Sequence, residues 1–226
     1  MPHDWNRFLQ TATERMAALV DEADPAAPVP GCPDWCVADL VEHVGGVYQW
    51  AAHVVRTGDP EARPAPAPTD LGELPGWFRT HADDLVRVLV GTDPDQETWT
   101  FGRGRGTAGW WTRRQTHETH LHTFDLLDSQ GRGDEWDVPA ALAWDAVREV
   151  VTLFYPRQLR MGRIDPLPGT LLLTPTDLDA EPVAVGEGRP VVEVNAPASE
   201  LVLLAYRRRT SVDPAAAELF AHGLTP

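Results

Sequence analysis

Residues 113–125, RRQTHETHLHTFD, decide how this chain folds and where its chemistry lies. An α-helix turns by about 100° per residue, so side chains four residues apart share one face. Glu118 and His122 form such a pair, and Trp111 and Asp125 lie on the same stripe. If Trp111 points into a core, the carboxylate and the imidazole point there too. Buried groups of this kind are costly unless they are paired or bind a metal.

A second polar residue interrupts an apolar stripe earlier in the chain. The segment that begins near Val37 and stops at the RTGDP turn has the apolar periodicity of a helix, and His43 lies about 60° from the centre of its apolar face. A histidine from one helix and a Glu-x3-His pair from another leave coordination positions open, as catalytic zinc sites do. The sequence therefore predicts a divalent metal, most simply zinc, at His43, Glu118 and His122, with Asp125 orienting a ligand imidazole.

Other histidines crowd the same segment. The pair His117-Glu118 invites a metalloprotease interpretation, but the H-E-x-x-H motif needs histidine at position 121, where Leu121 stands. By helical angle His117 and His120 fall away from the face of Glu118, so we expect them at the flank or surface. A lone helical histidine is more often structural than a ligand, so only the combined set supports a metal site.

Composition excludes several classes of partner. The 226 residues carry a formal net charge of −15, and all 19 basic residues are arginine. A nucleic-acid-binding protein or one bound to an anionic membrane needs a basic surface, so we expect neither partner. No apolar run reaches the roughly 18–20 residues of a membrane span, and the first residues lack a signal-peptide pattern. We therefore expect a cytoplasmic protein, and the residue bias favours a GC-rich bacterial source.

The apolar pattern changes along the chain. Helical periodicity predicts helices at 4–23, from about 37, at 74–90, at 109–129 and from Pro139 to 154 or 155. Short Val- and Leu-rich runs bounded by Gly, Pro and Asp then predict strands, followed by two helices. The predicted fold class is α+β, with a four-helix bundle over residues 1–158 and a small α/β domain over residues 159–226.

The two cysteines form a C-x3-C pair, Cys32 and Cys36, which differs from the C-x2-C of redox and zinc motifs. Cys36 sits at the N-cap of the second predicted helix, and Asp39 follows three residues later, as in a capping box. A cysteine at a helix N-terminus can have a lowered pKa. A buried, poorly capping residue is the simpler interpretation, and whether the two cysteines are redox-active stays open.

Three segments resemble the mycothiol-dependent maleylpyruvate isomerase-like family of DinB/YfiT-like metal-binding bundles. CPDWCVADLVEHVGGVYQWA resembles its CPGW-T-V-x-D-L-V-x-H signature. RRQTHETHLHTFD is similar to its RR-x-x-H-E-x-x-V-H-x-x-D segment. VNAPASELVLLAYRR resembles its C-terminal G-P-A-S-D-L-L-L-x-L-x-G-R element. The segments occur in the family's order and span most of the chain.

The resemblance implies a four-helix bundle with a divalent metal, usually zinc, at the positions of His43, Glu118 and His122. It implies a sterol-carrier-like C-terminal domain whose arginine, matching Arg208, reaches the active site, and mycothiol as the thiol cosubstrate. This sequence departs from the pattern at three places, where Cys36 replaces the threonine cap and Ala196 and Arg207 replace glycines.

These observations predict a metal-dependent, mycothiol-using isomerase or S-transferase that acts on a small electrophilic substrate. Metal coordination deprotonates a thiol, so the thiolate is expected to bind at the metal. Arg208 and Arg114 are expected to bind a carboxylate of the substrate or of the thiol.

Two other functions remain open on the sequence alone. One is a non-catalytic metal- or ligand-binding module, in which His117, Asp125 or a cysteine closes a four-ligand site. The other is a metal-dependent hydrolase that uses bound water, with Asp125 as the general base. The oligomeric state, the substrate and the identity of the divalent metal are not determined by the sequence.

Overall fold

The computed structural model describes residues 4–61, 63–102 and 104–226. The chain divides into two compact units, one that ends at Trp136 and one that spans Asp137–Pro226. The first unit is helical apart from a short ribbon, and the second combines helices with a small sheet. This arrangement confirms the predicted α+β class.

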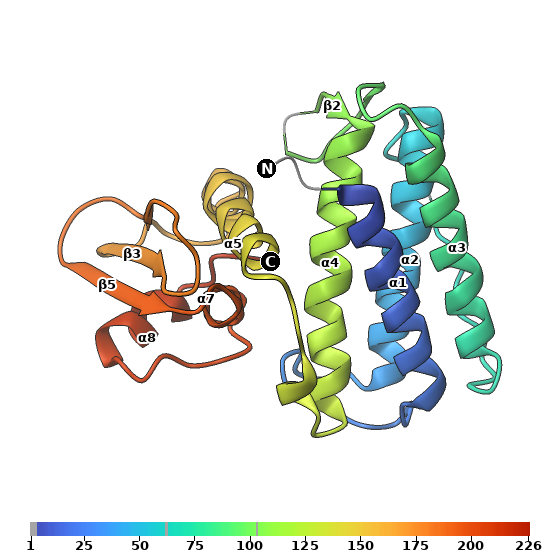
Figure 1. The fold of residues 1–226 in the computed structure, drawn as a ribbon, viewed down its shortest axis with the longest axis horizontal. Coiled ribbons are helices and arrows are strands. Elements are labelled where there is room, and N and C mark those ends of the chain that lie inside the picture. Colours follow the sequence, from blue (N-terminus) through green and yellow to red (C-terminus); the bar gives the residue numbers. More distant parts are fainter. Residues whose placement is uncertain (1–3, 62, 103) are drawn as a thin grey trace. The chain divides into compact units, whose positions relative to one another are not determined.

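The first unit is a four-helix bundle (Figure 1). Helix α1 packs on α3 and α4, and α2 packs on the same two helices. None of the described helices is long and apolar enough to cross a membrane. The four helices are α1 (Trp5–Glu22), α2 (Val37–Thr57), α3 (Leu74–Gly91) and α4 (Ala108–Ser129).

Local sequence signals set the limits of α2. At its start, the backbone N–H of Cys36 donates to Oδ2 of Asp39 at 2.8 Å, which satisfies one of the free amides of the first turn. At its end, Gly58 takes the left-handed conformation, with φ of 74°, that suits glycine at a helix C-terminus. With these limits, His43 lies in the second turn of the helix.

Helix α4 differs from the other three because its buried side chains are largely polar. Trp111 and Leu126 pack in the apolar core, while arginine, glutamine, threonine, histidine and carboxylate side chains between them are also buried. A bundle does not need such groups for packing, and each needs a partner. The buried polar side chains in the middle of α4 therefore mark the part of the bundle where a functional site is expected.

A short antiparallel ribbon precedes α4, between β1 (Glu97–Thr98) and β2 (Gly106–Thr107). The sequence predicted only a glycine-rich connection there, so this element was missed. A Cβ at Gly106 would lie 2.5 Å from Cγ2 of Thr100, so glycine is required for the close approach of the two segments.

The second unit contains a three-stranded sheet with the order β4-β3-β5. β3 pairs with β4 antiparallel and with β5 parallel. Helix α7 contacts β3 and β5, and α5 packs on α7. The elements are α5 (Ala140–Glu149), a π-helical segment (Val150–Phe154), α6 (Tyr155–Arg160), β3 (Thr170–Pro175), β4 (Val183–Val185), β5 (Val191–Ala196), α7 (Ala198–Ala205) and α8 (Pro214–Ala221).

The sequence predicted a division after residue 158. In the structure the division between the two units instead falls after Trp136. The predicted fifth helix is broken into α5, the π-helical segment and α6. It belongs to the second unit because α5 packs on α7 and the π-helical segment contacts β4. The change from helical to strand pattern in the sequence therefore falls inside the second unit.

Candidate metal centre

Three side chains from two helices converge in the bundle. Nε2 of His43, on α2, lies 3.5 Å from Oε1 of Glu118, on α4. Nε2 of His122, one turn further along α4, lies 3.3 Å from the same oxygen. Ligand atoms about 2 Å from one zinc ion lie roughly 3–4 Å apart, so the spacing and the nitrogen and oxygen donors fit a divalent metal.

Arg114 pairs with the second carboxylate oxygen of Glu118. It lies one turn earlier on α4, and its guanidinium forms an ion pair with Oε2. Burial alone would raise the pKa of Glu118, but the charge of Arg114 and hydrogen bonds from His122 and His43 outweigh it and hold this pKa well below its usual range. Glu118 is therefore ionised, with Oε1 directed to the two histidines.

Asp125 fixes the ring of His122 from the other side. Oδ2 of Asp125 lies 2.9 Å from Nδ1 of His122, and Asp125 is completely buried. Burial would lower the pKa of His122, but hydrogen bonds to Asp125 and Glu118 outweigh it and raise this pKa to about 9. The arrangement turns Nε2 toward Glu118, which is the orientation that a metal ligand needs.

His43 forms the accessible edge of the centre. Its side chain is 37% exposed, whereas that of His122 is 8% exposed. The ring of Trp35 lies beside it, with centroids 4.9 Å apart. Of these two histidines, His43 is therefore the more exposed to solvent.

Cys32 contacts the same network. Its Sγ lies 3.7 Å from Oδ2 of Asp125, and together with His122 these residues form a second group of converging ligand atoms. The Sγ of Cys36 instead lies 3.0 Å from Oδ2 of Asp39. Both cysteines are free thiols. The C-x3-C spacing gave no sign of the contact between Cys32 and Asp125.

The structure corrects the expectation for His117. The residue is 4% exposed, not at the surface, and its ring meets Trp5 of α1 edge-on with centroids 5.4 Å apart. This follows from the packing of α1 along α4, which covers that face. On the same side, burial, with the nearby charges of His117 and Arg15, lowers the pKa of His120 to about 4.

Comparison with known proteins agrees with this architecture. The family model described as "Mycothiol maleylpyruvate isomerase N-terminal domain" matches residues 8–127, a range that includes the three converging side chains. The chain belongs to the mycothiol-dependent maleylpyruvate isomerase family. This confirms the family predicted from the three sequence segments. The sequence matches none of the curated proteins.

Two solved structures of the family share the fold. The crystal structure of the mycothiol-dependent maleylpyruvate isomerase superposes with a TM-score of 0.69 at 11% identity, over 90% of this chain and 88% of that one. A histidine-to-alanine mutant of the mycothiol-dependent maleylpyruvate isomerase gives 0.66 at 13% identity, with the same coverage. The match extends over both units, so the family fold includes the small α/β part.

Arg208 lies in the second unit, in the turn that follows α7 (Ala198–Ala205). Its Nη1 donates to the backbone carbonyl of Tyr206 at 3.0 Å. The preceding Arg207 has φ of 59°, in the left-handed region that favours glycine. An arginine takes this backbone conformation at some energetic cost.

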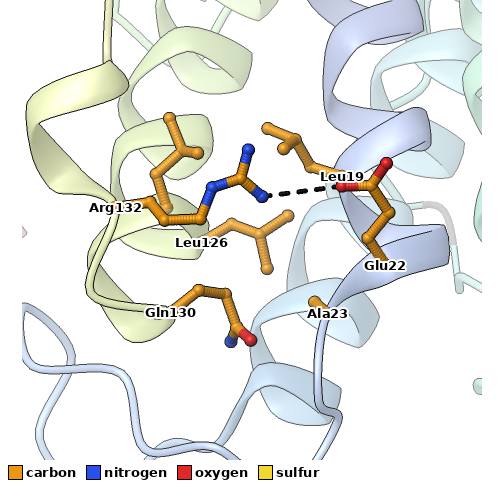
Figure 2. Close-up of a pocket in the computed structure, with 7 residues that line it drawn as sticks. Leu19, Glu22, Ala23, Leu126, Gln130 and Arg132 are labelled. Atoms are coloured by element: carbon orange, nitrogen blue, oxygen red, sulfur yellow. Dashed lines mark ion pairs between the residues drawn. The ribbon is translucent and has the colours of Figure 1, made fainter.

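A surface pocket of about 220 Å³ lies elsewhere on the bundle, between α1 and the end of α4 (Figure 2). In it Nη1 of Arg132 lies 3.5 Å from Oε2 of Glu22. Leucine side chains form the remaining wall together with Ala23 and Gln130. None of the predicted site residues lines this pocket, so it is separate from the metal centre.

Proposed function

We propose that this protein is a metal-dependent isomerase or S-transferase that uses mycothiol and acts on a small electrophilic substrate. The observation that carries the proposal is the convergence of His43, Glu118 and His122, with one ligand at the accessible edge. A three-ligand set leaves a position for an incoming thiol, as catalytic zinc sites do for water or substrate. Membership of the family supports mycothiol as that thiol.

We propose that buried residues of α4 hold the metal ligands in the charge state and orientation that this chemistry needs. Zinc or a similar divalent ion at the three ligands would supply the Lewis acidity that deprotonates a thiol and leaves a nucleophilic thiolate. Arg114 holds Glu118 as the anion, and Asp125 holds the His122 ring in place. We propose that these two residues orient the ligands, and that the exposed edge at His43 admits the thiol and the substrate.

Two reactions follow from one nucleophile. Addition of the thiolate to a conjugated double bond, rotation about the resulting single bond and elimination of the thiol would convert a cis isomer into the trans isomer. Maleylpyruvate, the compound in the names of the family's solved structures, has such a bond. Attack on a halide or an epoxide would instead leave the thiol attached to the product.

The position of Asp125 argues against hydrolysis. A hydrolase needs a general base within hydrogen-bond reach of the attacking water. Asp125 is fully buried and faces Nδ1 of His122, on the opposite side of the ring from Glu118. It therefore suits orientation of the ring and not proton transfer at the open position.

The test is thiol dependence. Zinc-loaded protein is mixed with maleylpyruvate, with and without mycothiol, and the cis–trans conversion is followed by absorbance. A parallel assay offers mycothiol and a model aryl halide. We expect turnover in one of the assays, only with both zinc and mycothiol, and none with His122→Ala. Release of halide from the aryl halide without thiol would support a hydrolase, and no turnover or thiol binding would support a non-catalytic module.

A further inference from the structure

Gln115 carries a buried acceptor without a partner. The residue is 1% exposed, and within the described ranges 4–61, 63–102 and 104–226 no donor reaches its Oε1. Leaving a buried polar atom unsatisfied destabilises the folded state, because the atom loses its hydrogen bonds to water. Native structures contain few such atoms, and each calls for a reason.

The helical position of Gln115 places this amide beside the metal ligands. It precedes Glu118 by three residues and His122 by seven, so it lies within about 60° of both around the axis of α4. Side chains three residues apart have Cβ atoms about 5–6 Å from each other. Gln115 therefore lies about one helical turn from Glu118 and two turns from His122, on the same face of α4.

Neighbouring hydroxyl groups are engaged elsewhere. The hydroxyl of Thr119 donates to the backbone carbonyl of Gln115 at 2.7 Å. The hydroxyl of Tyr48 lies 2.7 Å from Oγ1 of Thr119 and 3.9 Å from Sδ of Met16. The hydroxyl protons of Thr119 and Tyr48 are thus engaged with other acceptors of the protein. The side-chain oxygen of Gln115 is left for a donor from outside the chain.

We propose that Oε1 of Gln115 accepts a hydrogen bond from the thiol that binds at the metal centre. The assignment rests on the function proposed above and narrows its ligand class to thiols that carry an amide N–H or a hydroxyl. One turn of helix is about 5 Å, which suits a donor two or three bonds from the sulfur. The amide N–H of an N-acylated cysteinyl group has this spacing, and mycothiol contains such a group.

The experiment compares Gln115→Met with the unchanged protein. Methionine keeps the length of the side chain and removes the acceptor. Three thiols are titrated into the cobalt-loaded proteins and followed by sulfur-to-cobalt absorption. Ethanethiol has no further donor, N-acetylcysteamine has one amide N–H, and mycothiol has amide and hydroxyl donors.

We expect the substitution to weaken N-acetylcysteamine and mycothiol by about 5–10-fold and to leave ethanethiol unchanged. The metal content should stay the same. Because the variant no longer buries an unsatisfied amide, its unfolding midpoint without ligand should rise by about 2–4 °C. Gain of stability together with loss of affinity separates a ligand-binding role from a structural one.

Two control variants sharpen the comparison. Thr116→Val changes a buried residue about 160° around α4 from Glu118 and should leave all three affinities unchanged. Gln158→Met makes the same substitution at a buried glutamine whose Oε1 accepts a hydrogen bond from Arg163 at 3.5 Å. It should lower the unfolding midpoint, since there the amide is satisfied.

Several results would overturn the assignment. An equal effect of Gln115→Met on all three thiols, no effect on any, or a lowered unfolding midpoint would each show that the amide does not serve the ligand. Failure of the unchanged protein to bind cobalt or any thiol would overturn the proposed function itself, and the assignment with it.

Discussion

Nδ1 of His122 lies 2.9 Å from Oδ2 of Asp125, a carboxylate with no exposed surface. A histidine that binds a metal commonly donates its other ring N–H to a carboxylate, which fixes the ring and strengthens the ligand nitrogen. Here the same ring presents Nε2 to Oε1 of Glu118 at 3.3 Å. The buried carboxylate and the accessible centre are thus connected through one imidazole.

Asp125→Asn should weaken zinc binding by about 10-fold, because the amide keeps the shape but loses the charge that supports the imidazole. Zinc affinity is measured by competition with a chromophoric chelator. Asp128→Asn, one turn further along α4, serves as the control and should bind zinc like the unchanged protein. Equal affinity in both variants would show that Asp125 does not support the metal ligand.

Arg114→Met should destabilise the metal-free bundle by about 3 kcal/mol, since removing one partner leaves a buried carboxylate uncompensated. It should also weaken zinc binding if Arg114 orients Glu118. If Arg114 instead binds a carboxylate of the substrate, zinc binding would be unchanged and only KM would rise. Chemical unfolding, zinc titration and kinetics separate the two roles. Arg105→Met removes an exposed ion pair with Glu97 and should change stability by less than about 0.5 kcal/mol.

The ion pair between α2 and α3 predicts a pH-dependent stability difference. Two hydrogen bonds of 2.9 and 2.6 Å from Arg56 lower the pKa of Asp84 in the folded state. The contribution is complete above the pKa of the unfolded state and is lost as the pH falls through the folded-state pKa. Asp84→Asn should therefore cost about 0.5–1 kcal/mol at neutral pH, and the difference should shrink toward pH 3.

Urea unfolding of Asp84→Asn at about pH 7, 5 and 3 checks this prediction. Asp83→Asn changes the exposed neighbouring carboxylate and provides the control. A difference that stays constant across these pH values would mean that the charge of Asp84 does not stabilise the packing of α2 on α3.

For Arg208 the family resemblance implies a role in substrate binding. Arg208→Met should raise KM for an anionic substrate by about 10-fold and leave zinc content unchanged, because a charge-assisted hydrogen bond is worth about 1.5–3 kcal/mol. Arg209→Met is the matched control in the same turn. Unchanged KM in Arg208→Met would remove Arg208 from the active site.

The helical part of the fold was predictable because its signals are local. Apolar residues repeat at three- and four-residue steps, and Gly58 and the Cys36–Asp39 pair mark the limits of α2. The same periodicity placed His43, Glu118 and His122 on faces that the structure brings together. Because α2 packs on α4, these faces can meet inside the bundle.

Other features depend on tertiary contacts that a single sequence does not encode visibly. The burial of His117 under α1 and the contact of Cys32 with Asp125 both depend on neighbouring segments. The division after Trp136 was missed because α5 has an ordinary helical pattern and only its packing on α7 assigns it to the second unit.

The central claim is that His43, Glu118 and His122 bind a divalent metal, and metal content tests it most directly. The unchanged protein and His122→Ala are equilibrated with zinc, freed of unbound metal, checked for folding by circular dichroism and analysed by atomic emission. We expect about one ion per chain in the unchanged protein and its loss in the folded variant. No metal in either protein, or equal metal in both, would contradict it.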